Sequence, residues 1–144
     1  MFRQAGATNV TWVWTVAASS PVTTALSPWW PGNSWVNWVG VNAYYTQPDA
    51  TFHCVLGKTL TEVAKVTSEP VLLTETGANP VAGRARAIAS LFSGVEGTPR
   101  LLGFIWFDYD KTASHNWRID ADPGALAAFK AGAKQYVTLR LAAG

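Results

Sequence analysis

The sequence contains very little cysteine and no obvious metal-binding pattern. Cys54 is the single cysteine in 144 residues, so the chain can form no internal disulfide and no metal site built from several thiols. The two histidines, His53 and His115, lie far apart in the sequence and lack the spacing of zinc ligands. We therefore expect neither a metal ion nor another cofactor.

Charge and long apolar runs are also scarce. Charged residues make up 14% of the chain, the formal net charge is +2, and the lysines and arginines are scattered, which argues against a nucleic-acid partner. No apolar run approaches the roughly 20 residues that span a membrane. The first six residues lack the apolar segment of a signal peptide and look like the end of a helix capped by Gly6, as if the chain began within an element.

Apolar and aromatic residues, by contrast, are plentiful. Residues 1–144 are 49% hydrophobic and include eight tryptophans, enough material for one domain with a sizeable core. Indole rings fill cores, but they also stack on the faces of sugar rings. Residues 17–34 are rich in Ser, Pro, Thr and Gly and carry Trp29 and Trp30, so we expect a long loop that serves a function.

Strand patterns alternate with helix patterns along the chain. We expect strands at residues 9–16, 37–45, 71–74 and 101–107, and helices around residues 56–64, 88–95 and 123–136. Such alternation predicts an α/β fold with right-handed crossovers and a parallel sheet. No glycine-rich phosphate loop follows the first strand, which argues against a nucleotide-binding fold.

Each expected strand turns polar at its carboxyl end, the edge at which such folds bind ligands. Glu75 directly follows the apolar run Val71–Thr74, and Thr76-Gly77 is expected to end that strand. Because burying a charge is costly, we expect the carboxylate at the wet end of the strand. It is either a catalytic group or a structural Glu paired with an Arg, and the residues alone leave both interpretations open.

Four blocks of residues, taken in order, resemble glycoside hydrolase family 26, which contains β-mannanases and related β-glucanases. They are Trp12-Val13-Trp14, Val39–Tyr44, Leu73–Gly77, and Phe104–Asp108 followed by Trp117-Arg118-Ile119. The resemblance implies a (β/α)8 TIM barrel in which these blocks form strands five to eight. Residues 1–144 would then be one partial catalytic domain, the C-terminal half of the barrel.

The resemblance also implies roles for individual residues. Glu75 would be the nucleophile of a retaining hydrolase, and Tyr44 would orient it through a hydrogen bond from its phenol. Trp106 would form an apolar floor beneath the sugar. Weaker candidates for contact with substrate are Trp14, Trp29, Trp30, Trp35 and His115, whereas Trp12 and Trp38 suit core packing better.

Retaining hydrolysis needs a second carboxyl group, the acid/base, about 5 Å from the nucleophile. In the family this Glu lies at the end of strand four, and no carboxylate here matches its motif. We therefore expect the chain to begin after that point and to be nearly inactive alone. Asp108, Asp110 and Asp120 are expected to pair with Lys111 and Arg118 rather than to act in catalysis.

Half a barrel leaves two open sheet edges, so we expect either that a partner half-barrel or a second copy of the chain covers them, or that the chain is only marginally stable. The expected substrate is a polysaccharide or oligosaccharide, with β-1,4-mannan, mixed-linkage glucan and xylan all left open. The alternative is a non-catalytic carbohydrate-binding remnant. By resemblance the protein would be extracellular.

Overall fold

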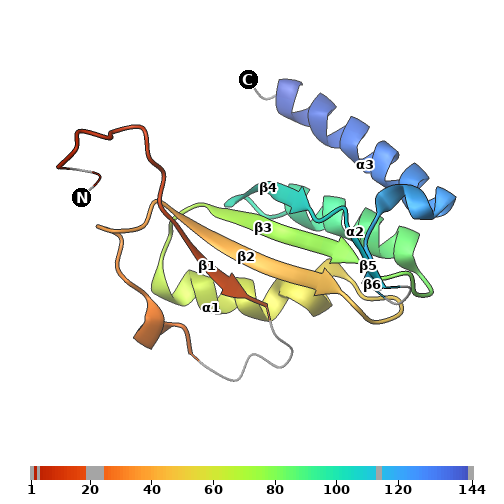
Figure 1. The fold of residues 1–144 in the computed structure, drawn as a ribbon, viewed down its shortest axis with the longest axis horizontal. Helices are drawn as coiled ribbons and strands as arrows, with labels where there is room; N and C mark the ends of the chain where they lie inside the picture. Colours follow the sequence, from red (N-terminus) through yellow and green to blue (C-terminus); the bar gives the residue numbers. More distant parts are fainter. Residues whose placement is uncertain (1, 3, 19–24, 113–114, 143–144) are drawn as a thin grey trace.

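The computed structural model describes residues 2, 4–18, 25–112 and 115–142, with side chains up to residue 136. Four strands form one parallel sheet in chain order (Figure 1): β1 (Val13–Ala17), β2 (Trp38–Tyr45), β3 (Val71–Ala78) and β4 (Leu101–Trp106). Helices separate β2 from β3 and β3 from β4, so the expected α/β fold with parallel strands alternating with helices is confirmed.

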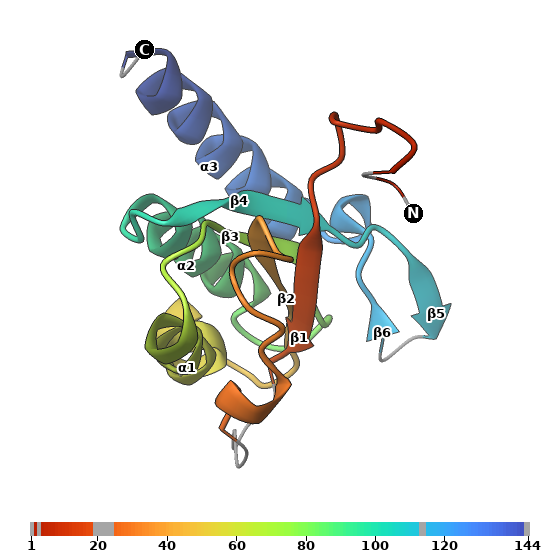
Figure 2. The same cartoon turned by 90° about the vertical axis from the view of Figure 1, so that its left-hand side faces the viewer.

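Three α-helices are described: α1 (Lys58–Val66), α2 (Arg84–Glu96) and α3 (Pro123–Ala142). A π-helical turn, η2 (His53–Gly57), leads directly into α1. The helices lie on one side of the sheet (Figure 2). Asp122 caps α3, because its Oδ1 accepts hydrogen bonds from the backbone N–H groups of Gly124 and Ala125 at 2.8 and 3.1 Å. No helix in the described part of the chain is long and apolar enough to cross a membrane.

The alternation of side chains along β2 shows how the sheet is divided between two faces. Val39, Val41, Ala43 and Tyr45 are buried and belong to the core, together with residues from the helices such as Leu56, Val63, Ile88 and Leu91. The residues between them point to the opposite side, which no helix covers. We call this side the open face.

Two elements differ from the sequence-based expectation. β3 does not end at Thr76-Gly77 but continues to Ala78, because Tyr44 and Tyr45 of β2 pair with Gly77 and Ala78. Between β4 and α3, where no strand was expected, lies a short antiparallel pair, β5 (Asp110–Thr112) and β6 (His115–Asn116). Within the expected loop over residues 17–34, a 3-10 turn, η1, spans Ser27–Trp29, and residues 19–24 lie outside the described part.

β1 and β4 are the edge strands of the sheet. Apolar side chains on both edges are exposed, including Val13 on β1 and Leu102 and Ile105 on β4. One edge carbonyl is nevertheless covered, since the hydroxyl of Tyr136 on α3 donates to Leu102 O at 2.8 Å. Both edges therefore expose apolar surface.

Candidate active site

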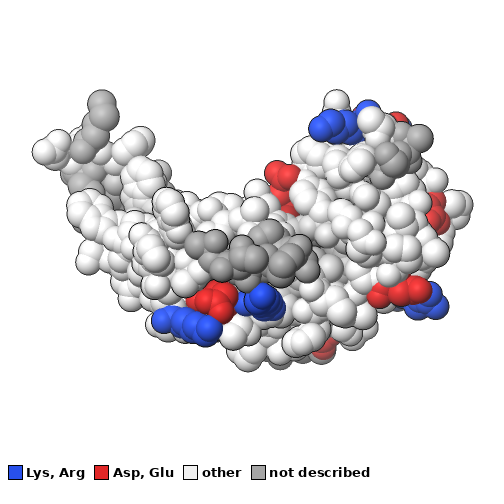
Figure 3. All heavy atoms as spheres, turned by 90° about the horizontal axis from the view of Figure 1, so that it is seen from below, with Lys and Arg blue, Asp and Glu red and all other residues white. Residues whose placement is uncertain are grey.

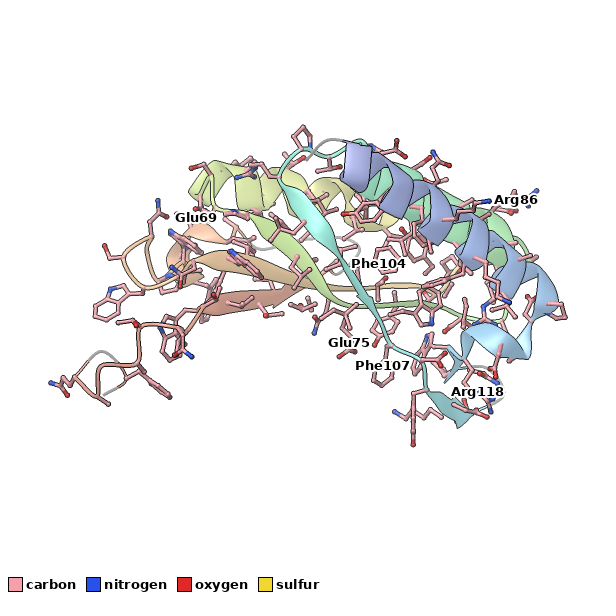
Figure 4. The ribbon with its side chains drawn as sticks, turned by 90° about the horizontal axis from the view of Figure 1, so that it is seen from above. Glu69, Glu75, Arg86, Phe104, Phe107 and Arg118 are labelled. Carbon is pink, nitrogen blue, oxygen red and sulfur yellow. The ribbon has the colours of Figure 1, made fainter. Side chains whose placement is uncertain are left out.

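An irregularity in β3 decides the direction of the Glu75 side chain. In the register between β2 and β3, Gly40 pairs with Leu72 and Asn42 pairs with Glu75, so two residues of β2 match three of β3. Strict alternation from Leu72 would point Glu75 toward the helices. The extra residue reverses this, and Glu75 lies with Asn42 on the open face. Figure 4 shows Glu75 on that side of the sheet.

Tyr44 and Glu75 meet across neighbouring strands. The Tyr44 hydroxyl donates a hydrogen bond to Glu75 Oε1, and both side chains are half-buried. Partial burial of the phenol, together with the hydrogen bond to and the charge of Glu75, raises the pKa of Tyr44. The phenol therefore stays protonated at neutral pH and remains a hydrogen-bond donor. Because it donates to Oε1, it does not engage Oε2 of Glu75.

A small polar layer lies beside this pair. The Thr74 hydroxyl donates to Asn42 Oδ1 at 2.7 Å. A Cβ on Gly40 would lie only 2.3 Å from Thr15 Oγ1 and 2.9 Å from Thr74 Oγ1, so Thr15 and Thr74 close over the glycine. Gly40 thus allows β1, β2 and β3 to bring hydroxyl and amide groups together under the carboxylate.

Two aromatic rings border the pair on its other side. The Trp117 ring lies 5.0 Å from the Tyr44 ring and 5.5 Å from the Phe107 ring, measured between centroids. Phe107 also meets Tyr44 edge-to-face at 6.2 Å. The arrangement joins the end of β4 and the residue after β6 to the Tyr44–Glu75 pair.

A cleft of about 740 Å³ opens next to Glu75, large enough for an oligosaccharide segment. Its walls come from the end of β1, the open face of β2, the connection that follows β2, and η2; they include Ala17, Asn42, Tyr44, residues 46–50, Cys54 and Val55. Hydrogen bonds from Thr51 lower the pKa of the Cys54 thiol at this wall. The only other carboxylate among the described lining residues is Asp49, which forms an ion pair with Arg86.

The structure places Trp106 beside α3. Thr76 of β3, which is fully buried, pairs with Trp106, and the indole packs on Phe129 of α3 at 5.5 Å. Its Nε1–H donates to Trp117 O at 2.8 Å. Trp106 therefore lies on the helix side of β4, and Phe107, one residue later, turns to the open face, as Figure 4 shows beside Glu75.

The other expected substrate contacts are not brought to Glu75. Trp14 is half-buried and packs edge-to-face on Trp30 at 5.1 Å, and both rings pack against the core. Trp29 and Trp35 are 68% and 66% exposed and do not line the cleft within the described part. His115 on β6 lies 5.7 Å from the Trp117 ring and contacts Thr112.

Sequence reasoning assigned no role to Trp117, Phe107, Asn42 or Thr74. The first two were visible only as part of the family blocks, and strict alternation from Leu101 would have favoured Trp106 over Phe107, because it does not include the extra β4 residue between Leu101 and Phe104. The described residues contain no group of three or more His, Cys, Asp or Glu side chains able to hold a metal ion. Charged side chains are sparse on the face shown in Figure 3 and form no basic stripe there.

Comparison with known proteins gives three findings. The model of glycosyl hydrolase family 26 matches residues 1–89. Endoglucanase H of Acetivibrio thermocellus is 25% identical over 140 residues, which cover 90% of this chain and 15% of that protein. The solved structure of a GH26 β-mannanase from Bacteroides ovatus matches with a TM-score of 0.61 at 22% identity, over 88% of this chain and 37% of the other.

The chain thus spans only a minor part of the length of each of these two proteins. The similarity to the β-mannanase structure concerns the fold, since the identity is low. The family model, however, covers more than half of the chain, including Tyr44 and Glu75. On that match, the chain belongs to glycosyl hydrolase family 26.

Proposed function

We propose that this chain carries the nucleophile of a retaining glycoside hydrolase. Glu75 Oε2 attacks the anomeric carbon, the glycosidic C–O bond breaks, and the departing oxygen receives a proton from a general acid. Water then releases the sugar from the glycosyl-enzyme ester. The observation that carries the proposal is the hydrogen bond from Tyr44 to Glu75 on the open face, beside the cleft, in a member of this family.

Tyr44 acts as an orienting donor in this proposal. Its hydrogen bond engages Glu75 Oε1 and fixes the carboxylate plane, which directs the other oxygen toward the cleft. Because the pKa of Tyr44 is raised, the phenol keeps this role across the neutral range.

The proposed substrate is a β-1,4-mannan or a related β-glucan. One relative is named an endoglucanase and the other a β-mannanase, and the cleft offers neutral polar groups from Asn42, Tyr44 and residues 46–47. Such groups suit the hydroxyls of a neutral glycan. Xylan is a third candidate, and the rates at which different fluorosugars label Glu75 distinguish the three glycans.

We further propose that residues 1–144 correspond to the C-terminal half of a (β/α)8 barrel, strands five to eight. Two observations support this: the four parallel strands in sequential order with helices on one side, and the exposed apolar edges β1 and β4. The general acid would then come from a partner half-barrel, because Asp49, the second carboxylate of the cleft, is engaged by Arg86. The proposed location of action is extracellular, where the polymer is found.

Covalent labelling tests the proposal without a general acid. We would use 2-deoxy-2-fluoro-β-glycosyl fluorides of mannobiose, cellobiose and xylobiose, because fluoride departs without a proton. Peptide mass analysis is expected to find the sugar on Glu75, and the sugar that labels fastest identifies the glycan. Glu75→Gln is expected to abolish labelling, whereas the control Glu62→Gln, which alters only a surface pair with Lys65, retains it.

The competing function is glycan binding without turnover. It predicts saturable binding of oligosaccharides by calorimetry, with no covalent adduct for any of the three sugars. That result would replace the hydrolase proposal with the carbohydrate-binding remnant.

A further inference from the structure

Trp117 makes more contacts around the Tyr44–Glu75 pair than any role assigned so far explains. Its ring is tilted at 45° against the Tyr44 ring, and it meets Phe107 and His115 on its other sides. It is not among the described residues that line the cleft. Its nearest functional neighbour is therefore the phenol.

Trp117 is itself fixed from three directions. Its backbone N–H donates to Tyr109 O at 2.9 Å, and its carbonyl accepts the indole N–H of Trp106 at 2.8 Å. The ring rests on Gly77, where an added Cβ would lie 2.8 Å from Trp117 Cδ1. Gly77 is the β3 residue that pairs with Tyr44, so the indole occupies the space that a side chain there would take.

The indole N–H contributes nothing to this arrangement. Nε1 of Trp117 is buried and has no hydrogen-bond partner among the described residues. Burying an unpaired donor opposes folding, because the group loses its hydrogen bonds to water. A residue that carries such a cost next to a functional pair is useful for the shape of its ring, not for its polar atom.

We propose that Trp117 is a positioning residue: its ring, seated on Gly77, holds the Tyr44 ring in place and thereby aims the carboxylate of Glu75. The proposal rests on the proposed function and adds a residue to the machinery of that same site. Among the described residues, the other ring against Tyr44 is that of Phe107, whose centroid lies 6.2 Å away. Loss of the Trp117 ring would let the phenol rotate and release Oε1 of Glu75.

Three variants separate ring shape from indole chemistry. Trp117→Ala removes the support, Trp117→Phe keeps a ring and deletes the unpaired N–H, and Gly77→Ala displaces the ring while leaving Trp117 itself unchanged. Phe104→Leu is the control, because Phe104 packs on Phe92 and Phe129 on the helix side of β4, remote from Tyr44. Thermal unfolding is recorded for each variant to establish that it folds.

The first readout is the kinetics of labelling at Glu75 with the fastest fluorosugar. Trp117→Ala and Gly77→Ala are expected to lower the maximal labelling rate about 10- to 100-fold with little change in the half-saturating concentration, since misplacement of a reacting group acts on the chemical step. Trp117→Phe is expected to recover most of the rate. Equal maximal rates in the wild type and Trp117→Ala would overturn the proposal.

The second readout needs no labelling. The absorbance of the Tyr44 phenolate is followed with pH, using Tyr44→Phe to identify its signal. Ionisation of Tyr44 is expected to shift to lower pH in Glu75→Gln, and this shift is expected to disappear when Trp117→Ala is already present. A shift of unchanged size would overturn the proposal, whereas absence of labelling in the wild type would overturn only the proposed function.

Discussion

At the scale of single residues, the site depends on one hydrogen bond and on which oxygen it leaves free. Tyr44 binds Oε1 of Glu75, and the pKa of the phenol is raised by its partial burial and by that carboxylate. The donor thus cannot be lost by ionisation near neutral pH. The catalytic proposal therefore predicts that removing the hydroxyl harms the reaction far more than the fold.

Tyr44→Phe tests this directly. The ring contacts with Trp117 and Phe107 are kept, and only the donor to Glu75 is lost. A hydrogen bond to a charged group is worth about 1.5–3 kcal/mol, so we expect the labelling rate at Glu75 to fall about 10- to 100-fold. An unchanged rate would show that Tyr44 does not orient the nucleophile.

Tyr45, the next residue, provides a matched contrast on the helix side. It is buried, its hydroxyl has no partner among the described residues, and burial raises its pKa. Tyr45→Phe removes an unpaired polar atom, so the free energy of unfolding at pH 7 is expected to rise by about 1 kcal/mol in urea denaturation. A decrease of that size would contradict the assignment.

The same raised pKa sets a direction for alkaline stability. Above pH 10 the unfolded chain loses the Tyr45 proton while the folded chain retains it, so the folded state binds more protons and stability falls as pH rises. Below about pH 10 this contribution is fully present. Urea midpoints measured from pH 8 to 11 are expected to fall less steeply for Tyr45→Phe than for the wild type.

At the scale of elements, the extra residue in β3 and the alternation along β4 determine which side chains reach the open face. The strands and helices could be predicted from the apolar periodicity of the sequence. The hydrogen bond between Tyr44 and Glu75 could be predicted from the family blocks. The irregular register could not be predicted, since two residues of β2 match three of β3 only after both strands are paired. The side of β4 on which Trp106 lies could not be predicted for a related reason: between Val71 and Leu73 the pairing with β4 also slips by one, near Gly103.

The contact between α2 and α3 allows a prediction in which two effects oppose each other. Alanine is favoured over glycine inside a helix by about 1 kcal/mol. At Gly132, however, a Cβ would lie 2.3 Å from Phe92 Cδ2, so the ring or the helix must shift. We expect Gly132→Ala to lower the free energy of unfolding by about 1–3 kcal/mol. A more stable variant in thermal melts would mean that α3 does not pack there.

At the scale of the whole molecule, the open face and the two edge strands dominate. A four-stranded sheet with helices on one side leaves Val13 and Ile105 exposed, the latter at 54%. Exposed apolar edges favour association. We therefore expect the isolated chain to self-associate unless a partner half-barrel covers these edges.

Ile105→Lys tests this expectation. A charge on edge strand β4 opposes pairing with another strand, and the exposed side chain of Ile105 leaves room for the lysine. Sedimentation velocity at increasing concentration is expected to show wild-type oligomers and a shift of Ile105→Lys toward monomer. A wild-type chain that stays monomeric at every concentration would contradict it.

The extra residue in β3 has one more consequence, for how the gene can change. Removing or adding a single codon between Leu72 and Glu75 would turn the carboxylate from the cleft into the hydrophobic layer beneath the helices, however well the remaining residues matched. The connection that follows β2 carries no such condition on its length. Variation in chain length that preserves chemistry at Glu75 should therefore accumulate in the wall of the cleft and not in the strand that bears it.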